Sequence, residues 1–148
     1  MMRTQEKDLR LTVRSDPYLL ASIRSLVRGW LESWNVSSEA VHQVVLAIDE
    51  ACANAIRHAY EGRKDRCVEL TMHAEPEYFE FQVSDQGVPC PSECAEYRPL
   101  KIPDSEDLRP GGLGVQLMYE VFDEVQFCPG PTIGNCVTMK LMRRKRGI

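Results

Sequence analysis

The chain has 148 residues, 43% of them hydrophobic and 27% charged, which fits one globular domain over residues 1–148. A net charge of -4 at pH 7 argues against a nucleic-acid-binding surface as the main function, because binding to phosphates needs a concentrated basic face. No apolar run has membrane-spanning length, and residues 1–8 lack the apolar core of a signal peptide. We therefore expect a cytoplasmic protein without membrane contact.

The cysteines and the C-terminal tail point to no particular chemistry. Six cysteines include no CxxC pair, so they predict neither a disulfide framework nor a structural zinc site. Spacing alone would allow Cys90 and Cys94 to pair or to bind a metal. The tail over residues 143–148 is basic, and we expect it to be solvated.

The N-terminal part of the chain predicts one strand and two helices. Alternation of apolar and polar residues over 9–14 predicts a short, half-buried strand. Asp16-Pro17 then supplies a cap and a first-turn proline, and apolar spacing of three and four predicts an amphipathic helix over about 17–34 whose tryptophans lie in the core. A second helix is predicted over about 38–60, preceded or opened by a serine.

Glu50 and Asn54 on the second predicted helix are the first indication of chemistry. They are four residues apart and therefore project from one side of the helix. The small residues Ala47, Ala51 and Ala53 beside them would let a ligand approach the backbone. A polar stripe opposite an apolar one is equally what a solvated helix face looks like. This helix alone leaves both interpretations open.

Two strands are predicted next, over 68–74 and 79–85, and the second strand ends on an aspartate. Asp85 falls in the same alternation phase as the apolar residues of its strand, on the core side. A charge there is costly unless it is hydrogen-bonded. Asp85 is therefore either a turn-capping residue before Gly87 or an acceptor for the amino group of a ligand at the floor of a pocket.

A long proline-containing connection over about 86–112 predicts a lid over a ligand. It ends in Gly111-Gly112-Leu113-Gly114, directly before a helical pattern over 115–122. Glycine-rich backbone entering a helix offers free N–H groups to phosphate, although glycines also serve as hinges and caps. Two final strands are predicted over 124–127 and 136–141.

Together, Glu50-x-x-x-Asn54, Asp85-x-Gly87 and Gly112-x-Gly114 resemble, in this order and with a lid before the last, the motifs of the GHKL ATPases, which include DNA gyrase, histidine kinases and MutL. Within that superfamily the chain is most similar, over nearly its whole length, to the small anti-sigma-factor serine kinases of sporulation and general stress. The resemblance implies a Bergerat-type ATP-binding fold. This fold is a two-layer α/β (α+β) sandwich in which helices cover one face of a mixed, mostly antiparallel sheet.

The resemblance also implies roles for individual residues. Asn54 would ligate Mg²⁺ at the phosphates of ATP, and Glu50 would act as the base that activates a substrate hydroxyl. Asp85 would accept a hydrogen bond from the adenine amino group. The further nucleotide-binding residues that it implies are Gly87, Arg109, Gly112, Leu113, Gly114 and Asn135.

Two positions depart from the pattern of the family, and one invites a different interpretation. Pro89 and Asn135 stand where relatives often have a glycine and a threonine, which bears on lid motion and nucleotide affinity. His58 suggests a histidine kinase, but the chain has no separate pair of dimerising phosphoacceptor helices. We interpret His58 as structural.

The function implied by the resemblance is that of an ATP- and Mg²⁺-dependent serine/threonine protein kinase. It would phosphorylate a STAS-type anti-anti-sigma partner, sequester a sigma factor and form a homodimer. The alternatives are an ATP-dependent binding module that transfers no phosphate, and a simple ATPase. Glu50 favours the kinase over the binding module, because a binding module needs no base.

Overall fold

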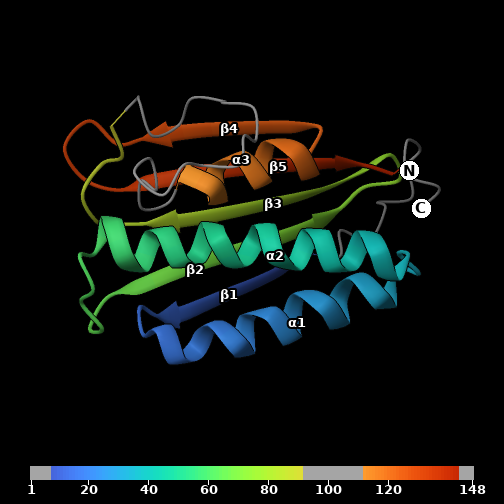
Figure 1. Cartoon of the computed structure of the whole chain (residues 1–148), viewed down its shortest axis with the longest axis horizontal. Helices are drawn as coiled ribbons and strands as arrows, with labels where there is room; N and C mark the ends of the chain where they lie inside the picture. The colour runs from blue at the N-terminus through green and yellow to red at the C-terminus, as the bar shows by residue number, and fades with distance from the viewer. Residues whose placement is uncertain (1–7, 92–111, 144–148) are drawn as a thin grey trace, which may run out of the picture.

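The computed structural model describes residues 8–91 and 112–143, which form a sheet covered by helices on one face (Figure 1). The strands are β1 Leu9–Arg14, β2 Cys67–Ala74, β3 Tyr78–Asp85, β4 Glu124–Pro129 and β5 Asn135–Met142. The helices are α1 Leu20–Ser33, α2 Ser38–Asn54 and α3 Gly112–Val121, with a 3-10 turn η1 at Pro17–Leu19 and a π-helical turn η2 at Ala55–Ala59. Every predicted strand and helix is present.

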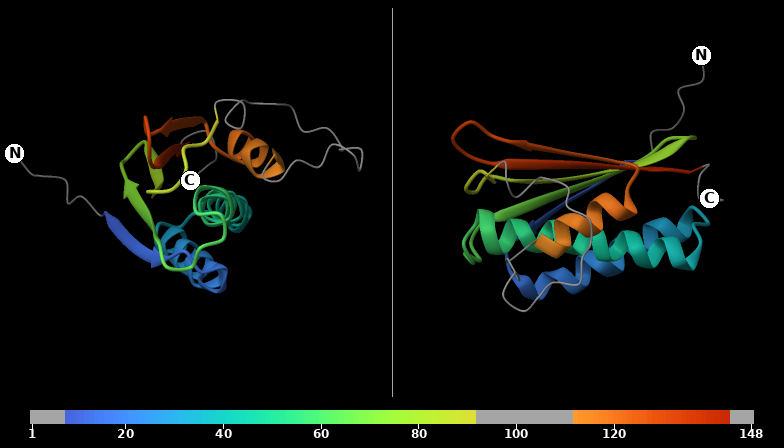
Figure 2. Two further views of the ribbon diagram at one scale, coloured as in Figure 1. Left: turned by 90° about the vertical axis from the view of Figure 1, so that its left-hand side faces the viewer. Right: turned by 45° about the horizontal axis from the view of Figure 1, so that its top comes forward.

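The two layers are clearest when the molecule is turned on its side, with the helices on one side of the sheet (Figure 2). The sheet has the strand order β1-β2-β3-β5-β4. All four pairings within the described sheet are antiparallel, so it is antiparallel throughout and not mixed. The reason is that β4 returns at the far edge parallel to β3, and β5 then inserts between them.

The start of the first helix follows the prediction from Asp16-Pro17. The Asp16 carboxylate accepts a hydrogen bond from the Tyr18 N–H at 3.0 Å, and Pro17 opens a 3-10 turn that leads into α1. At the other end of α1, Trp30 packs edge-on against Phe79 and Phe81 of β3, with ring centroids 5.5 and 5.8 Å apart. This tryptophan is partly buried and packs against the core, although the prediction placed it within the core.

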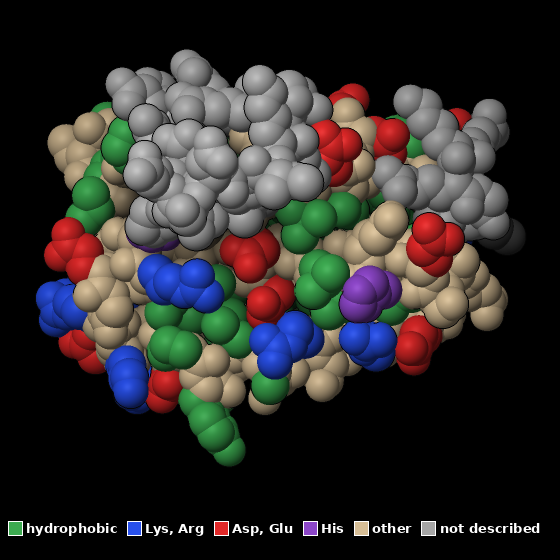
Figure 3. Space-filling model, in the orientation of Figure 1, with side chains coloured by type: hydrophobic (Ala, Val, Ile, Leu, Met, Phe, Trp, Pro, Cys, Tyr) green, Lys and Arg blue, Asp and Glu red, His purple; other side chains and the backbone are tan. Residues whose placement is uncertain are grey.

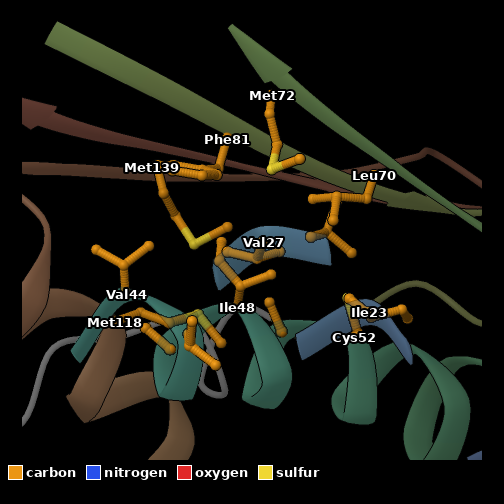
Figure 4. Packing of buried hydrophobic residues seen from close by; sticks show 14 of the residues in the cluster. Ile23, Val27, Val44, Ile48, Cys52, Leu70, Met72, Phe81, Met118 and Met139 are labelled. Carbon is orange, nitrogen blue, oxygen red and sulfur yellow. The ribbon is translucent and has the colours of Figure 1, made fainter. Parts of the chain in front are cut away.

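Apolar side chains from both layers meet in one core (Figure 4). Met72, Phe81 and Met139 of the sheet lie over Val27 of α1 and Ile48 of α2, and each of these side chains is fully buried. Burying such a side chain stabilises the fold by roughly 1.5–3 kcal/mol. The core therefore fixes the position of α2 against β3, and with it the positions of Glu50 and Asp85.

Helix α2 is the central helix of its layer, packed between α1 and α3 and against β3. Ala47, Ala51 and Ala53 are consequently buried, with exposed fractions of 0, 4 and 1%. Their small side chains admit neighbouring helices, and so they are not part of a solvated face or of an open floor for a ligand. Most of the circumference of α2 is protein interior, which narrows the candidate site to its few polar side chains.

Within residues 8–91 and 112–143, no helix is long and apolar enough to cross a membrane. The cysteines in these ranges are free thiols, and burial raises the pKa of Cys52 to about 12, so this core thiol stays protonated. Cys94, which the spacing would allow to pair or to bind a metal with Cys90, lies outside the described residues.

Candidate functional site

Most of the predicted site residues lie on elements that the structure describes. Glu50 and Asn54 lie on α2, Asp85 ends β3 with Gly87 just after it, and Asn135 opens β5. Gly112, Leu113 and Gly114 are the first residues of α3. Arg109 and residues 92–111 of the predicted lid lie outside the described residues. The structure brings the described residues together in two groups, one around Glu50 and one around Asp85.

The Glu50 carboxylate lies against the first turn of α3. A Cβ atom added at Gly114 would stand 2.5 Å from Glu50 Oε2 and 3.1 Å from Glu50 Cβ, so a side chain there would displace this carboxylate. Glu50 has no hydrogen-bond partner in the part of the chain that the structure describes. Two motifs that are far apart in the sequence thus meet at one carboxylate.

The Asn54 side chain holds an unpartnered polar atom. Its Oδ1 atom is buried and accepts no hydrogen bond from any described residue. An unsatisfied buried carbonyl oxygen costs about 1–3 kcal/mol and in a native protein calls for an explanation. Amide oxygens are among the hard oxygen ligands that Mg²⁺ accepts, so this atom suits a cation site that the protein alone does not fill.

The helix that carries Glu50 and Asn54 changes its winding directly after Asn54. Residues Ala55–Ala59 form a π-helical turn, which the Tyr60 N–H closes on the Ala55 carbonyl at 3.0 Å. Such turns are uncommon and often occur at functional sites. The exposed side chain of His58 lies on this turn and has no hydrogen-bond partner among the described residues.

Asp85 is buried at the end of β3, with an exposed fraction of 6%. Its Oδ1 atom accepts hydrogen bonds from the Gly87 N–H at 2.9 Å and from Asn135 Nδ2 at 3.0 Å. Burial raises the pKa of the Asp85 carboxyl, and these hydrogen bonds oppose the rise. A hydrogen bond from the Asn135 backbone also acts on the carboxylate, and no described side chain donates to its other oxygen, Oδ2.

The turn after β3 packs closely against the π-helical turn at Gly87. A Cβ atom at Gly87 would collide with the Ala59 carbonyl, and the Val88 N–H donates to the Ala59 oxygen at 2.7 Å. The motif around Asp85 thus rests directly on the end of the helix that carries Asn54. This contact explains the need for glycine at position 87 without reference to any ligand.

Tyr60 is a site-supporting residue to which the sequence analysis assigned no role. Its hydroxyl oxygen accepts a hydrogen bond from the Gln86 N–H at 2.8 Å and donates to the Cys67 carbonyl at 2.5 Å. The side chain thereby ties the end of the π-helical turn to β2 and to the turn after Asp85. The sequence could have indicated this role, because Tyr60 directly follows a buried helix and a buried tyrosine hydroxyl usually has a hydrogen-bond partner.

Arg24 and Asp49 form an ion pair, at 2.9 Å, that links α1 to α2 next to Glu50. The side chains of both residues are partly exposed, so the pair contributes at most about 1 kcal/mol. Charged side chains of both signs are interspersed on the face that α1 and α2 present in Figure 3. This face lacks the uniform basic character of a nucleic-acid-binding surface.

Comparisons with known proteins show the family and the fold of this chain. Residues 13–141 match the family described as the histidine kinase-like ATPase domain. The serine-protein kinase RsbW of Listeria innocua is 28% identical over 84% of this chain and 82% of its own, and the anti-sigma F factor of Halalkalibacterium halodurans is 26% identical over 79% and 80%. A chain in the crystal structure of the SiaB-SiaC complex from Pseudomonas aeruginosa has the same fold, with a TM-score of 0.69 and 13% identity over 94% of this chain and 91% of that one.

Proposed function

Because the chain belongs to the histidine kinase-like ATPase domain family, we propose that it is an ATP- and Mg²⁺-dependent serine/threonine protein kinase that acts as an anti-sigma factor. The names of two relatives, a serine-protein kinase and an anti-sigma F factor, support both halves of this proposal. The match extends over most of each chain, so the proposal concerns the whole domain and not a fragment of it.

The observation that carries the kinase proposal is the Glu50 carboxylate beside the first turn of α3, which has no hydrogen-bond partner within residues 8–91 and 112–143. It lies one helical turn from Asn54, whose orphaned Oδ1 atom would hold Mg²⁺. The backbone N–H groups at Gly112, Leu113 and Gly114 would bind phosphate oxygens at the start of α3. When bound, MgATP supplies the phosphoryl group. Glu50 would orient the substrate hydroxyl and take its proton, as phosphoryl transfer requires.

Recognition of the adenine base would fall to the group around Asp85. Asp85 Oδ2 would accept a hydrogen bond from the adenine amino group, and the absence of a side chain at Gly87 lets the backbone turn pack closely there. Arg109, which lies outside the described residues, would reach the γ-phosphate. The two ends of the proposed site are joined through the contact between Gly87 and the π-helical turn.

The proposed partners follow from the same relatives. The phosphorylated protein would be a small STAS-type anti-anti-sigma protein, modified on a serine or threonine. The sequestered protein would be a sigma factor, which implies action in the cytoplasm. The active form would be a homodimer. The proposed alternative is a module of the same fold that binds its partner in an ATP-dependent way, or hydrolyses ATP, without transferring phosphate to a protein.

The test measures the transfer of labelled γ-phosphate from ATP to a STAS protein whose gene lies near the gene for this protein. We expect transfer by the unchanged protein, a loss of about 100-fold or more in Glu50→Gln, and an ATP dissociation constant within about threefold of the original. Glu32→Gln, a charge removal on the exposed surface of α1, is the matched control and should leave transfer intact. Nucleotide-dependent binding of the STAS protein by both forms, with transfer by neither, would establish the alternative instead.

A further inference from the structure

We propose that Asn135 is a positioning residue that sets the nucleobase specificity of the site by holding the Asp85 carboxylate in one orientation. The inference rests on the proposed binding of an adenine nucleotide and deepens it. It assigns to Asn135 a role through Asp85, where the family resemblance suggests direct contact with the nucleotide. Asn135 is assigned this indirect role because its carboxamide is already hydrogen-bonded within the protein.

The Asn135 carboxamide is fully engaged as a donor within the protein. Nδ2 donates to Asp85 Oδ1 at 3.0 Å and to the Val88 carbonyl at 2.8 Å, and Oδ1 accepts from the Cys90 N–H at 2.6 Å. An asparagine amide has two N–H hydrogens, and both are used here. Asn135 therefore has no hydrogen left to donate to a nucleotide.

The same contacts fix the Asp85 carboxylate. Oδ1 receives two donors, the Gly87 N–H and Asn135 Nδ2, and a hydrogen bond from the Asn135 backbone also acts on the carboxylate. Rotation of the carboxylate would break both bonds in a buried environment, where an unpaired polar group is costly. These bonds thereby hold the carboxylate in one orientation, in which Oδ2 would accept from the ligand.

Backbone pairing brings Asn135 to this position. Asn135 lies opposite Asp85 in the ladder between β3 and β5, and the preceding Gly134 N–H donates to the Gly87 carbonyl at 2.7 Å. The strand and the turn after Asp85 are thus joined by the backbone and by the carboxamide. A threonine hydroxyl, which has a single hydrogen, could not replace all three side-chain bonds of Asn135.

A fixed carboxylate oxygen selects a hydrogen-bond donor on the ligand. The exocyclic amino group of adenine can donate to Asp85 Oδ2, whereas the carbonyl oxygen of hypoxanthine at the same ring position would face it acceptor to acceptor. A site built to hydrogen-bond one group discriminates strongly against an analogue that leaves its buried atoms unpaired. The pair ATP and inosine triphosphate therefore reports on the orientation of Asp85.

The experiment measures dissociation constants of ATP and inosine triphosphate for the unchanged protein, for Asn135→Leu and for Thr138→Val. The last is a control for the loss of a polar group farther along β5. We expect the unchanged protein and the control to prefer ATP by about tenfold or more, or about 1.4 kcal/mol. In Asn135→Leu, ATP should bind about tenfold more weakly and the preference should fall below about threefold.

Equal weakening of both nucleotides, with the preference for ATP retained, would indicate a purely structural role and would overturn this inference alone. Equal binding of ATP and inosine triphosphate by the unchanged protein would overturn the recognition of adenine by Asp85 as well. Asn135→Asp keeps the shape of the side chain if Asn135→Leu does not fold. It should abolish the preference at neutral pH and regain part of it on acidification, when the two carboxyls share a proton. A preference that does not change with pH in Asn135→Asp would also overturn the inference.

Discussion

The two ends of the proposed site are built in opposite ways. The end proposed to bind the adenine base, here called the base end, is hydrogen-bonded within the protein. Its bonded groups are Asp85 Oδ1, the Gly87 backbone, the Tyr60 hydroxyl and the Asn135 carboxamide. At the phosphate end, the Glu50 carboxylate and the buried Asn54 Oδ1 atom have no partner among the described residues. The groups named at the first end are bonded within the protein, and those named at the second are not bonded to any described residue.

This difference separates the parts of the site that support the fold from the parts that serve the chemistry. Groups already bonded in the protein present a fixed surface to the ligand and also stabilise the fold. Unpartnered groups lower stability and are retained where a ligand or reaction uses them. Substitutions at the base end should therefore reduce stability and affinity together, while substitutions at the phosphate end should separate them.

The largest expected effect at the base end is that of Gly87→Ala. The added Cβ would collide with the Ala59 carbonyl, a backbone group that cannot move aside easily. We expect the free energy of unfolding to fall by about 3 kcal/mol. ATP should bind at least about tenfold more weakly, because the turn after Asp85 must shift. Urea unfolding and nucleotide titration measure the two effects.

Gly29→Ala is the matched control for this prediction. Gly29 lies within α1, and a Cβ there meets nothing within 4 Å. The substitution should raise the free energy of unfolding by about 1 kcal/mol through helix propensity. Similar effects of both substitutions would mean that the contact between Gly87 and the π-helical turn does not constrain the site.

A smaller loss is expected for Tyr60→Phe, which removes only a hydroxyl. The Gln86 N–H and the Cys67 carbonyl lose a partner, so the free energy of unfolding should fall by about 2 kcal/mol. Tyr18→Phe removes the same atom from a side chain that is 85% exposed, and should be neutral. Amide hydrogen exchange at Gln86 should accelerate in Tyr60→Phe alone. An unchanged exchange rate there would contradict the assigned hydrogen bond.

At the phosphate end, the sign of the effect should reverse. Asn54→Ala removes a buried oxygen without a partner, so the ligand-free protein should gain about 1 kcal/mol beyond the change in helix propensity. His42→Ala, at an exposed position of the same helix, is the control for that propensity change, because histidine and asparagine rank together. Asn54→Ala should also lose Mg²⁺-dependent ATP binding. Destabilisation by Asn54→Ala would remove the distinction between the two ends.

The sequence predicted the elements and the candidate residues better than it predicted the contacts between them. Alternation and helical spacing gave every strand and helix, and they placed Asp85 on the core side of its strand, where the structure has it. The same periodicity assigned Ala47 to a ligand-facing surface, although it lies between packed helices. Periodicity defines a face of an element but does not identify what covers it.

The contacts missed by sequence reasoning all join residues that are distant in the chain. Gly114 against Glu50, Gly87 against the π-helical turn, and Asn135 against Asp85 depend on how α3 and β5 pack onto the rest of the fold. The antiparallel sheet depends on the same packing, because β5 enters between β3 and β4. The motifs indicated candidate residues, and the tertiary structure shows that Asn135 donates a hydrogen bond to Asp85.

The smallest expected effect concerns acidity, and it separates stability from affinity within the base end itself. Burial raises the pKa of Asp85, so the folded protein takes up a proton at a higher pH than the unfolded chain does. Between these two pKa values, the free energy of unfolding should rise as the pH falls, since protonation removes a buried charge. Affinity for ATP should decline as the pH falls through the raised pKa, because adenine then loses its carboxylate acceptor.

Asp85→Asn should remove both pH effects, and comparing the two proteins at each pH cancels the titration of ATP itself. Thermal unfolding without nucleotide and titration with ATP provide the measurements. If the unchanged protein lost stability on acidification relative to Asp85→Asn, the carboxylate would be stabilised in the folded state. The hydrogen bonds from Gly87 and Asn135 would then stabilise the ionised carboxylate by more than its burial costs. The charge proposed to bind the ligand would in that case also stabilise the base end of the folded protein.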